Sequence, residues 1–117
     1  MNEHELKART KQFALRVMKL VAAFPKNMEG QTIANQLIRS GTSVGANYRA
    51  ACRARSKAEF IAKLGIVEEE ADESAFWMEL IIDGKLMDKK LVEPLLQETN
   101  ELVAIMAASR KSAIARK

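Results

Sequence analysis

The chain has 117 residues, a formal net charge of +4 and a hydrophobic fraction of 48%, with two prolines, five glycines and one cysteine. This length suits one domain, and this composition excludes a disordered chain because it can build a core. A single cysteine excludes an intrachain disulfide and predicts a cytoplasmic protein. No apolar run approaches the length that spans a bilayer, so no membrane partner is expected.

The first two helices of a single domain over residues 1–117 are predicted at about 5–24 and 31–54. Pro25 ends the first, because the residue before a proline is disfavoured in a helix. The second contains Gly41 and Gly45, which each cost up to about 1 kcal/mol relative to alanine. Glycines four residues apart let another helix approach closely, and we expect this packing role. The alternative is a break near Gly41.

The third helix is predicted over residues 57–83. Ser56 to Glu59 form a capping box, in which the serine oxygen accepts a backbone N–H and the glutamate reaches back. Apolar side chains then recur at the spacing of a bundle seam. Gly84 is expected to end the helix.

The fourth helix is predicted over residues 89–108, with Asp88 as its N-cap and a basic, frayed tail at 109–117. Four long helices joined by short turns predict an all-α, antiparallel up-down-up-down four-helix bundle. The apolar surface exceeds what one bundle buries, which predicts a homo-oligomer. The residues that carry this excess are Trp77, Leu80, Leu96 and Val103.

Cations gather around the turn between the second and third helices. Phosphate contacts need such a cluster, so it is the candidate nucleic-acid site, although basic turns also serve solubility alone. Only Tyr48 lies nearby to stack on a base, which argues against base-specific recognition. The cluster comprises Arg49, Arg53, Arg55, Lys57 and Lys63.

A polar face on the second helix is formed by Arg39, Ser43 and Asn47, which are spaced four apart. Glu73 of the third helix is expected to meet them. We interpret this set as a buried, satisfied network that fixes helix register. The alternative is contact with a small ligand or an RNA backbone.

A candidate magnesium site is formed by Glu69, Glu70 and Glu73. A Glu-Glu-x-x-Glu run on a helix holds magnesium in all-α nucleotide pyrophosphohydrolases, and such a hydrolase is the enzymatic alternative. Those enzymes add a Glu-x-x-Asp on the next helix, which this chain lacks. We therefore expect a solvated acidic face plus one buried glutamate paired with an arginine, with no metal or cofactor. His4 is the only histidine, and Cys52 is expected to be a packed thiol, so no catalytic triad is predicted.

Four segments of the sequence together resemble the four-helix bundle proteins of the 23S ribosomal RNA intervening-sequence family. They are Phe24-Pro25, Ile38-Arg39-Ser40, Ser43-Val44-Gly45-Ala46-Asn47 and Arg55-Ser56-Lys57-Ala58-Glu59-Phe60. The resemblance implies a left-handed bundle and a homopentameric ring. It supplies no catalytic residues, because no activity is established for the family. The family is also similar to the accessory variability protein of diversity-generating retroelements, a basic pentamer that binds nucleic acid. The chain departs in having Gly45 where many members have proline.

The expected function is that of a non-enzymatic binding or assembly protein. RNA or a ribonucleoprotein is the first candidate partner, held at the basic turn. A structural scaffold for another protein is a further alternative.

Overall fold

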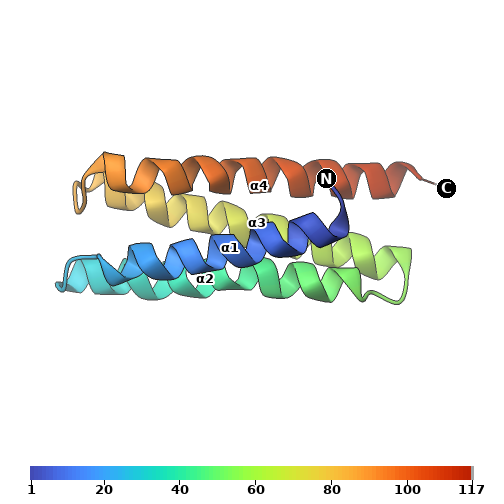
Figure 1. The fold of residues 1–117 in the computed structure, drawn as a ribbon, viewed down its shortest axis with the longest axis horizontal. Helices are drawn as coiled ribbons and strands as arrows, with labels where there is room; N and C mark the ends of the chain where they lie inside the picture. The colour runs from blue at the N-terminus through green and yellow to red at the C-terminus, as the bar shows by residue number, and fades with distance from the viewer. Residues whose placement is uncertain (117) are drawn as a thin grey trace.

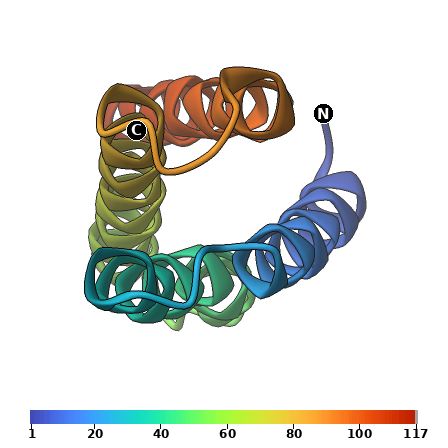
Figure 2. The ribbon, with the colours of Figure 1, turned by 90° about the vertical axis from the view of Figure 1, so that its left-hand side faces the viewer.

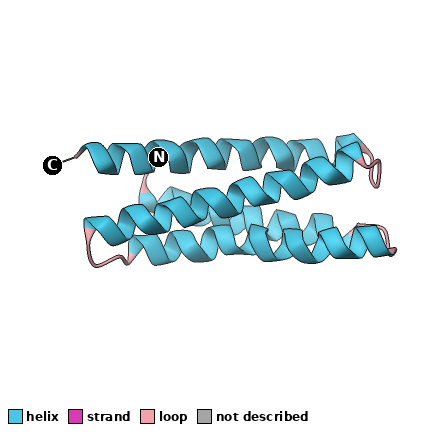
Figure 3. Cartoon of the chain, turned by 180° about the vertical axis from the view of Figure 1, so that it is seen from behind, coloured by secondary structure: helices cyan, strands magenta, loops and turns pink. Residues whose placement is uncertain are grey.

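Four α-helices and short turns make up the computed structural model, which describes residues 1–116 (Figure 1). The helices are α1 (Glu3–Ala22), α2 (Met28–Cys52), α3 (Lys57–Asp83) and α4 (Lys89–Ala115). No strand occurs within this range, and the molecule measures 50 × 20 × 18 Å. Figure 3 shows from behind that only turns separate the helices. No helix of residues 1–116 combines the length and apolar character needed to cross a membrane.

Each helix packs against the next one in the chain, and α1 meets α4 only sparsely. Within the described part of the chain, the backbones of the diagonal pairs, α1 with α3 and α2 with α4, do not approach each other closely. The view along the bundle accordingly shows four sides, with the one between α1 and α4 open (Figure 2). The α1–α2 and α3–α4 turns lie at one end, and the α2–α3 turn lies at the other (Figure 1).

Asparagine side chains start the first two helices earlier than predicted. The Asn2 side chain accepts a hydrogen bond from the Glu5 N–H at 2.8 Å, and the Asn27 side chain accepts one from the Gly30 N–H at 2.8 Å. Each oxygen satisfies a backbone donor that the first turn leaves without an intrahelical acceptor. Neither cap is predicted from the apolar pattern of the sequence, because that pattern begins only after them.

The capping box at the start of α3 forms with one difference. The Ser56 hydroxyl accepts from the Glu59 N–H at 3.0 Å, as predicted. The Glu59 carboxylate, however, accepts from the N–H of Arg55 at 3.2 Å and not from that of Ser56. The helix occupies Lys57–Asp83, which matches the predicted span.

The end of α3 corrects the role expected of Gly84. Gly84 keeps a helical φ of −77°, and Lys85 takes the left-handed conformation with a φ of 57°. The N–H of Leu86 then donates to the carbonyl of Ile81 at 3.0 Å, and the N–H of Lys85 donates to Ile82 at 3.0 Å. These two bonds form a Schellman motif, which here places a lysine where glycine is usual.

The predicted frayed tail is largely helical, because α4 continues to Ala115. Ala113 is buried within this extension, so the extension packs against the bundle instead of entering solvent. Alanine is the strongest helix former, which favours this end of the chain further. Lys117, the last residue of the predicted tail, lies outside the described residues.

The two glycines inside α2 lie where α1 approaches the helix closely. An added Cβ at Gly41 would lie 2.8 Å from both γ-carbons of Val17, and one at Gly45 would lie 3.3 Å from the Thr10 carbonyl oxygen. The helix is unbroken at Gly41, so the close-packing interpretation holds and the break does not occur. On the other side of α2, the Ser40 and Ser74 hydroxyls share a fully buried 2.8 Å hydrogen bond.

Candidate nucleic-acid interface

The turn between α2 and α3 presents exposed cations at one end of the bundle. Arg53 caps α2, Arg55 lies in the turn and Lys57 begins α3, and all three side chains are exposed. Lys63 is half-buried on α3. None of these four residues forms a salt bridge with another described residue. Their charges are therefore available to an outside anion.

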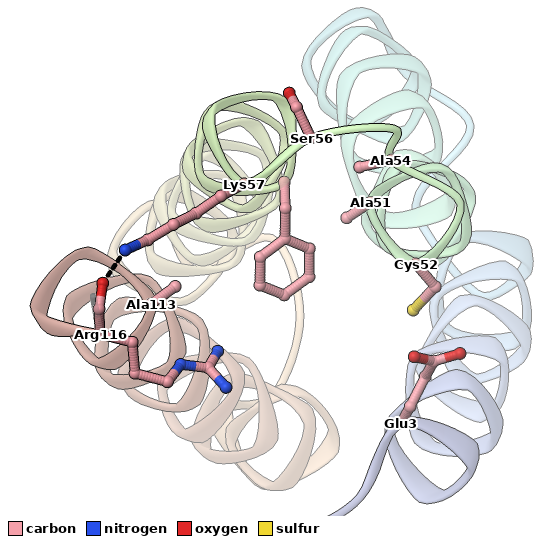
Figure 4. A pocket seen from close by; sticks show the side chains of 9 residues that line it. Glu3, Ala51, Cys52, Ala54, Ser56, Lys57, Ala113 and Arg116 are labelled. Carbon is pink, nitrogen blue, oxygen red and sulfur yellow. Dashed lines mark hydrogen bonds between the residues drawn. The ribbon is translucent and has the colours of Figure 1, made fainter.

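The C-terminal end of α4 adds a cation that the sequence analysis did not place here. Lys57 donates a hydrogen bond from its Nζ to the backbone carbonyl of Arg116. Both residues line a cavity of about 490 Å³ between the helix ends, with Glu3 and Cys52 on its opposite side (Figure 4). The Glu3 carboxylate makes this cavity mixed in charge, whereas Arg53, Arg55 and Lys63 lie outside its lining.

Arg49 lies apart from the turn, in a groove between α1 and α2. The groove has a volume of about 550 Å³ and is lined by small residues, including Gly45 and Ala46. His4, Lys7 and Lys11 of α1 line it together with Arg49. These α1 side chains were not predicted to lie beside Arg49. The absence of acidic residues from residues 6–28 indicates a positively charged first helix and could have suggested them.

Cys52 is not an activated thiol. Burial raises the pKa of the Cys52 thiol, and the hydrogen bond with Tyr48 offsets this rise only in part. A raised pKa leaves little thiolate at neutral pH, and thiolate is the nucleophilic form. The nearby arginines therefore do not activate Cys52, in agreement with the packing role expected of it.

The polar set on α2 divides into two groups. Arg39 forms ion pairs with α3, through Nη2 to Glu73 and through Nη1 to Glu70 at 3.5 Å. Ser43 donates to the Arg39 carbonyl at 2.7 Å and Asn47 donates to the Ser43 carbonyl at 2.9 Å, so both bond within their own helix. The Arg39 side chain is 54% exposed, whereas those of Glu73 and Glu70 are 34% and 18% exposed, so the pairs lie at the edge of the α2–α3 contact and not in a fully buried network.

The acidic run on α3 does not converge on one point. Glu70 and Glu73 both approach Arg39, and Glu73 also accepts a hydrogen bond from the Trp77 indole at 3.2 Å. Glu69 is exposed. Among residues 1–116, no three His, Cys, Asp or Glu side chains are placed to hold a metal ion together.

One ion-pair cluster joins α1 to α4, and the sequence analysis did not identify it. Arg9 donates to both oxygens of Glu98, from Nε at 2.8 Å and from Nη2 at 2.7 Å, and its Nη2 also donates to Glu101 at 2.9 Å. The two carboxylates raise the pKa of Arg9, the hydrogen bond with Glu98 being the largest cause. This cluster could not be predicted from local sequence, because its residues are far apart in the chain and meet only when α1 packs beside α4.

Comparison with known proteins agrees with this architecture. Residues 2–108 match the family model described as 23S rRNA-intervening sequence protein. A crystal structure from Bacteroides thetaiotaomicron, described as a protein of unknown function from the S23 ribosomal protein family, is similar with a TM-score of 0.87. The two sequences are 32% identical, and the alignment covers 95% of this chain and 99% of that one. No curated protein matches the chain.

Proposed function

The chain belongs to the 23S rRNA-intervening sequence protein family, and from this premise we propose that it is a non-enzymatic, cytoplasmic binding protein that holds RNA at one end of its bundle. The binding surface is the basic end, which we define as Arg53, Arg55, Lys57, Lys63 and Arg116. Arg49 extends it into the adjoining α1–α2 groove. The observation that carries the proposal is the exposed cluster of cations around the α2–α3 turn without acidic partners.

The chemistry of the basic end favours a phosphate backbone over a small ligand. Lysine and arginine bind phosphates as cations and release the counterions that surround a nucleic acid. Phosphate contacts position a protein without reading sequence, and the only tyrosine, Tyr48, is buried and cannot stack on a base. The proposed ligand is therefore structured RNA recognised by shape and charge.

The acidic surface of α3 supports a non-enzymatic role. Two of its three candidate metal-binding glutamates, Glu70 and Glu73, already face the guanidinium of Arg39. A cation at that position opposes a second positive ion nearby. We also infer that the helices run antiparallel in a left-handed up-down-up-down bundle, and that copies assemble as a homo-oligomer. The positions of the turns support the first inference, and the resemblance to the family implies a pentamer.

The test is RNA binding by fluorescence anisotropy with Arg53→Glu combined with Arg55→Glu. The matched control is Lys89→Glu combined with Lys90→Glu, which makes the same change of charge at the other end of the bundle. Both control residues are exposed in the first turn of α4, where an acidic side chain favours the helix and offsets the loss of the exposed Lys89–Glu93 ion pair. We expect the first variant to lose affinity by about tenfold or more, and the control to stay within about twofold. Equal losses in both variants would show attraction to net charge alone and would contradict the proposal.

A further inference from the structure

We propose that copies of this chain join head to tail, with the outer face of α1 in one copy packed on the outer face of α3 in the next. The α1 face consists of Lys11, Leu15, Met18 and Lys19. The α3 face consists of Glu69, Asp72, Phe76, Glu79 and Leu80. This inference rests on the self-assembly contained in the proposed function and identifies the surfaces that carry it.

The α1 face combines exposed apolar side chains with unopposed positive charge. Leu15 is 50% exposed and Met18 is 48% exposed, which is unusual for two large apolar side chains one turn apart. Lys11 and Lys19 flank them at helical spacing and are also exposed. Since residues 6–28 contain no acidic residue, nothing along α1 beyond its first turn neutralises these lysines.

The α3 face shows the same arrangement with the opposite charge. Phe76 is 50% exposed, and Leu80 lies one turn further along the helix, also exposed. Glu69, Asp72 and Glu79 surround them, are exposed and form no salt bridge within residues 1–116. Residues 64–84 contain no lysine or arginine. A cationic, partly apolar surface is therefore the complement that this face requires.

The two faces lie on different sides of the bundle. The backbones of α1 and α3 do not approach each other closely, and Figure 2 shows these helices at diagonal positions. One face can therefore engage one neighbour while the other remains free for a second neighbour. Such a contact is heterologous and builds a ring or a filament, whereas pairing two identical faces would oppose like charges.

The faces also match in height along the bundle. Gly41 packs against Val17 of α1, and the adjacent Ser40 bonds to Ser74 of α3, so Val17 and Ser74 lie at similar heights. Met18 and Phe76 follow these residues closely in sequence. Two copies placed side by side at the same level would consequently bring the apolar part of one face against that of the other, with lysines opposite carboxylates.

The test is a charge exchange read by multi-angle light scattering. One variant carries Glu69→Lys, Asp72→Lys and Glu79→Lys, and the other carries Lys11→Glu and Lys19→Glu. We expect the wild-type chain to be oligomeric and each variant alone to lose this assembly, because its two faces then have the same sign. Mixed together, the variants should associate in alternation as open chains or rings with an even number of members, because a ring of five cannot alternate. This association also shows that both variants are folded.

Three outcomes decide the inference. Recovery of assembly in the mixture supports it. Retention of the wild-type oligomer in both single variants overturns it, while leaving self-assembly itself in place. A monomeric wild-type chain overturns both the interface and the proposed assembly, but RNA binding at the basic end is judged separately, by its own variants. As a matched control, Lys26→Glu with Lys85→Glu reverses two lysines outside both faces and should leave the oligomer unchanged.

Discussion

The two sides of α1 are held in opposite ways. Against α2, it packs so closely that Gly41 leaves no room for a Cβ beside Val17, and no ion pair joins the two helices among the described residues. Against α4, contact is sparse, and Arg9 bridges to Glu98 and Glu101. One seam depends on shape and the other on charge.

A similar division holds along α2, between residues that pack inside the bundle and residues that are free to bind a partner. The run from Ser40 to Asn47, which carries much of the resemblance to the family, is used mainly for packing and for hydrogen bonds inside the bundle. The cations that follow it, at Arg53 and Arg55, make no such contacts with their side chains. The run from Ser40 to Asn47 therefore gives little information about a binding partner, although it is the most distinctive part of the resemblance.

Among the substitutions at these helix contacts, Gly41→Ala should cause the largest loss of stability. Its methyl group would lie 2.8 Å from the rigid, fully buried side chain of Val17. We expect the free energy of unfolding to fall by about 2–3 kcal/mol, because overpacking outweighs the gain in helix propensity. Urea denaturation measures this change.

Gly65→Ala is the matched control for that substitution. An added Cβ there meets only the Arg110 Cδ at 3.8 Å, an ordinary contact. We expect this variant to gain up to about 1 kcal/mol. If both variants change stability alike, the α1–α2 seam is not limited by space at Gly41.

Arg9→Met should have the next largest effect. The Arg9 and Glu98 side chains are only 24% and 16% exposed, and removal of the cation leaves a partly buried carboxylate without its partner. We expect a loss of about 2 kcal/mol by urea denaturation. A loss below about 0.5 kcal/mol, typical of an exposed pair, would show that charge does not hold the α1–α4 seam.

Ser74→Ala probes the buried hydroxyl pair between α2 and α3. The Ser40 hydroxyl would lose its 2.8 Å partner and keep only the Leu37 carbonyl at 3.4 Å. We expect a loss of about 1 kcal/mol. Ser40→Ala with Ser74→Ala should cost less than the sum of the single changes, and an additive result would mean that the two hydroxyls do not interact.

Arg39→Met should have the smallest effect. Its ion pairs with Glu70 and Glu73 lie on a seam that packing already holds, and its side chain is 54% exposed. We expect a loss of less than about 1 kcal/mol. A cost equal to that of Arg9→Met would remove the distinction between the two seams.

The helices could be predicted from the sequence where local chemistry decides them. Ser56 and Asp88 cap their helices as expected, since a cap depends only on residues within one turn. The extension of α4 beyond residue 108 was not predicted, because the burial of Ala113 depends on the rest of the bundle. Lys85 was missed because its left-handed backbone contradicts the usual preference for glycine.

The candidate site could be predicted only in part, because some of its residues come together only when the helices pack. Arg53, Arg55 and Lys57 are neighbours in sequence and stay together in the structure. Arg116 joins them only because α4 returns to this end of the bundle. Arg49 turns toward the cations of α1, a grouping that depends on how α1 packs against α2.

The most direct test of the proposed function is the affinity of the native chain for a structured RNA across a series of salt concentrations. The logarithm of the association constant should fall linearly with the logarithm of the salt concentration, with a slope of about −0.9 for each phosphate neutralised. Arg53→Glu with Arg55→Glu should reduce the magnitude of that slope by about 2. An affinity that is independent of salt, or a slope that these substitutions leave unchanged, would contradict RNA binding at the basic end.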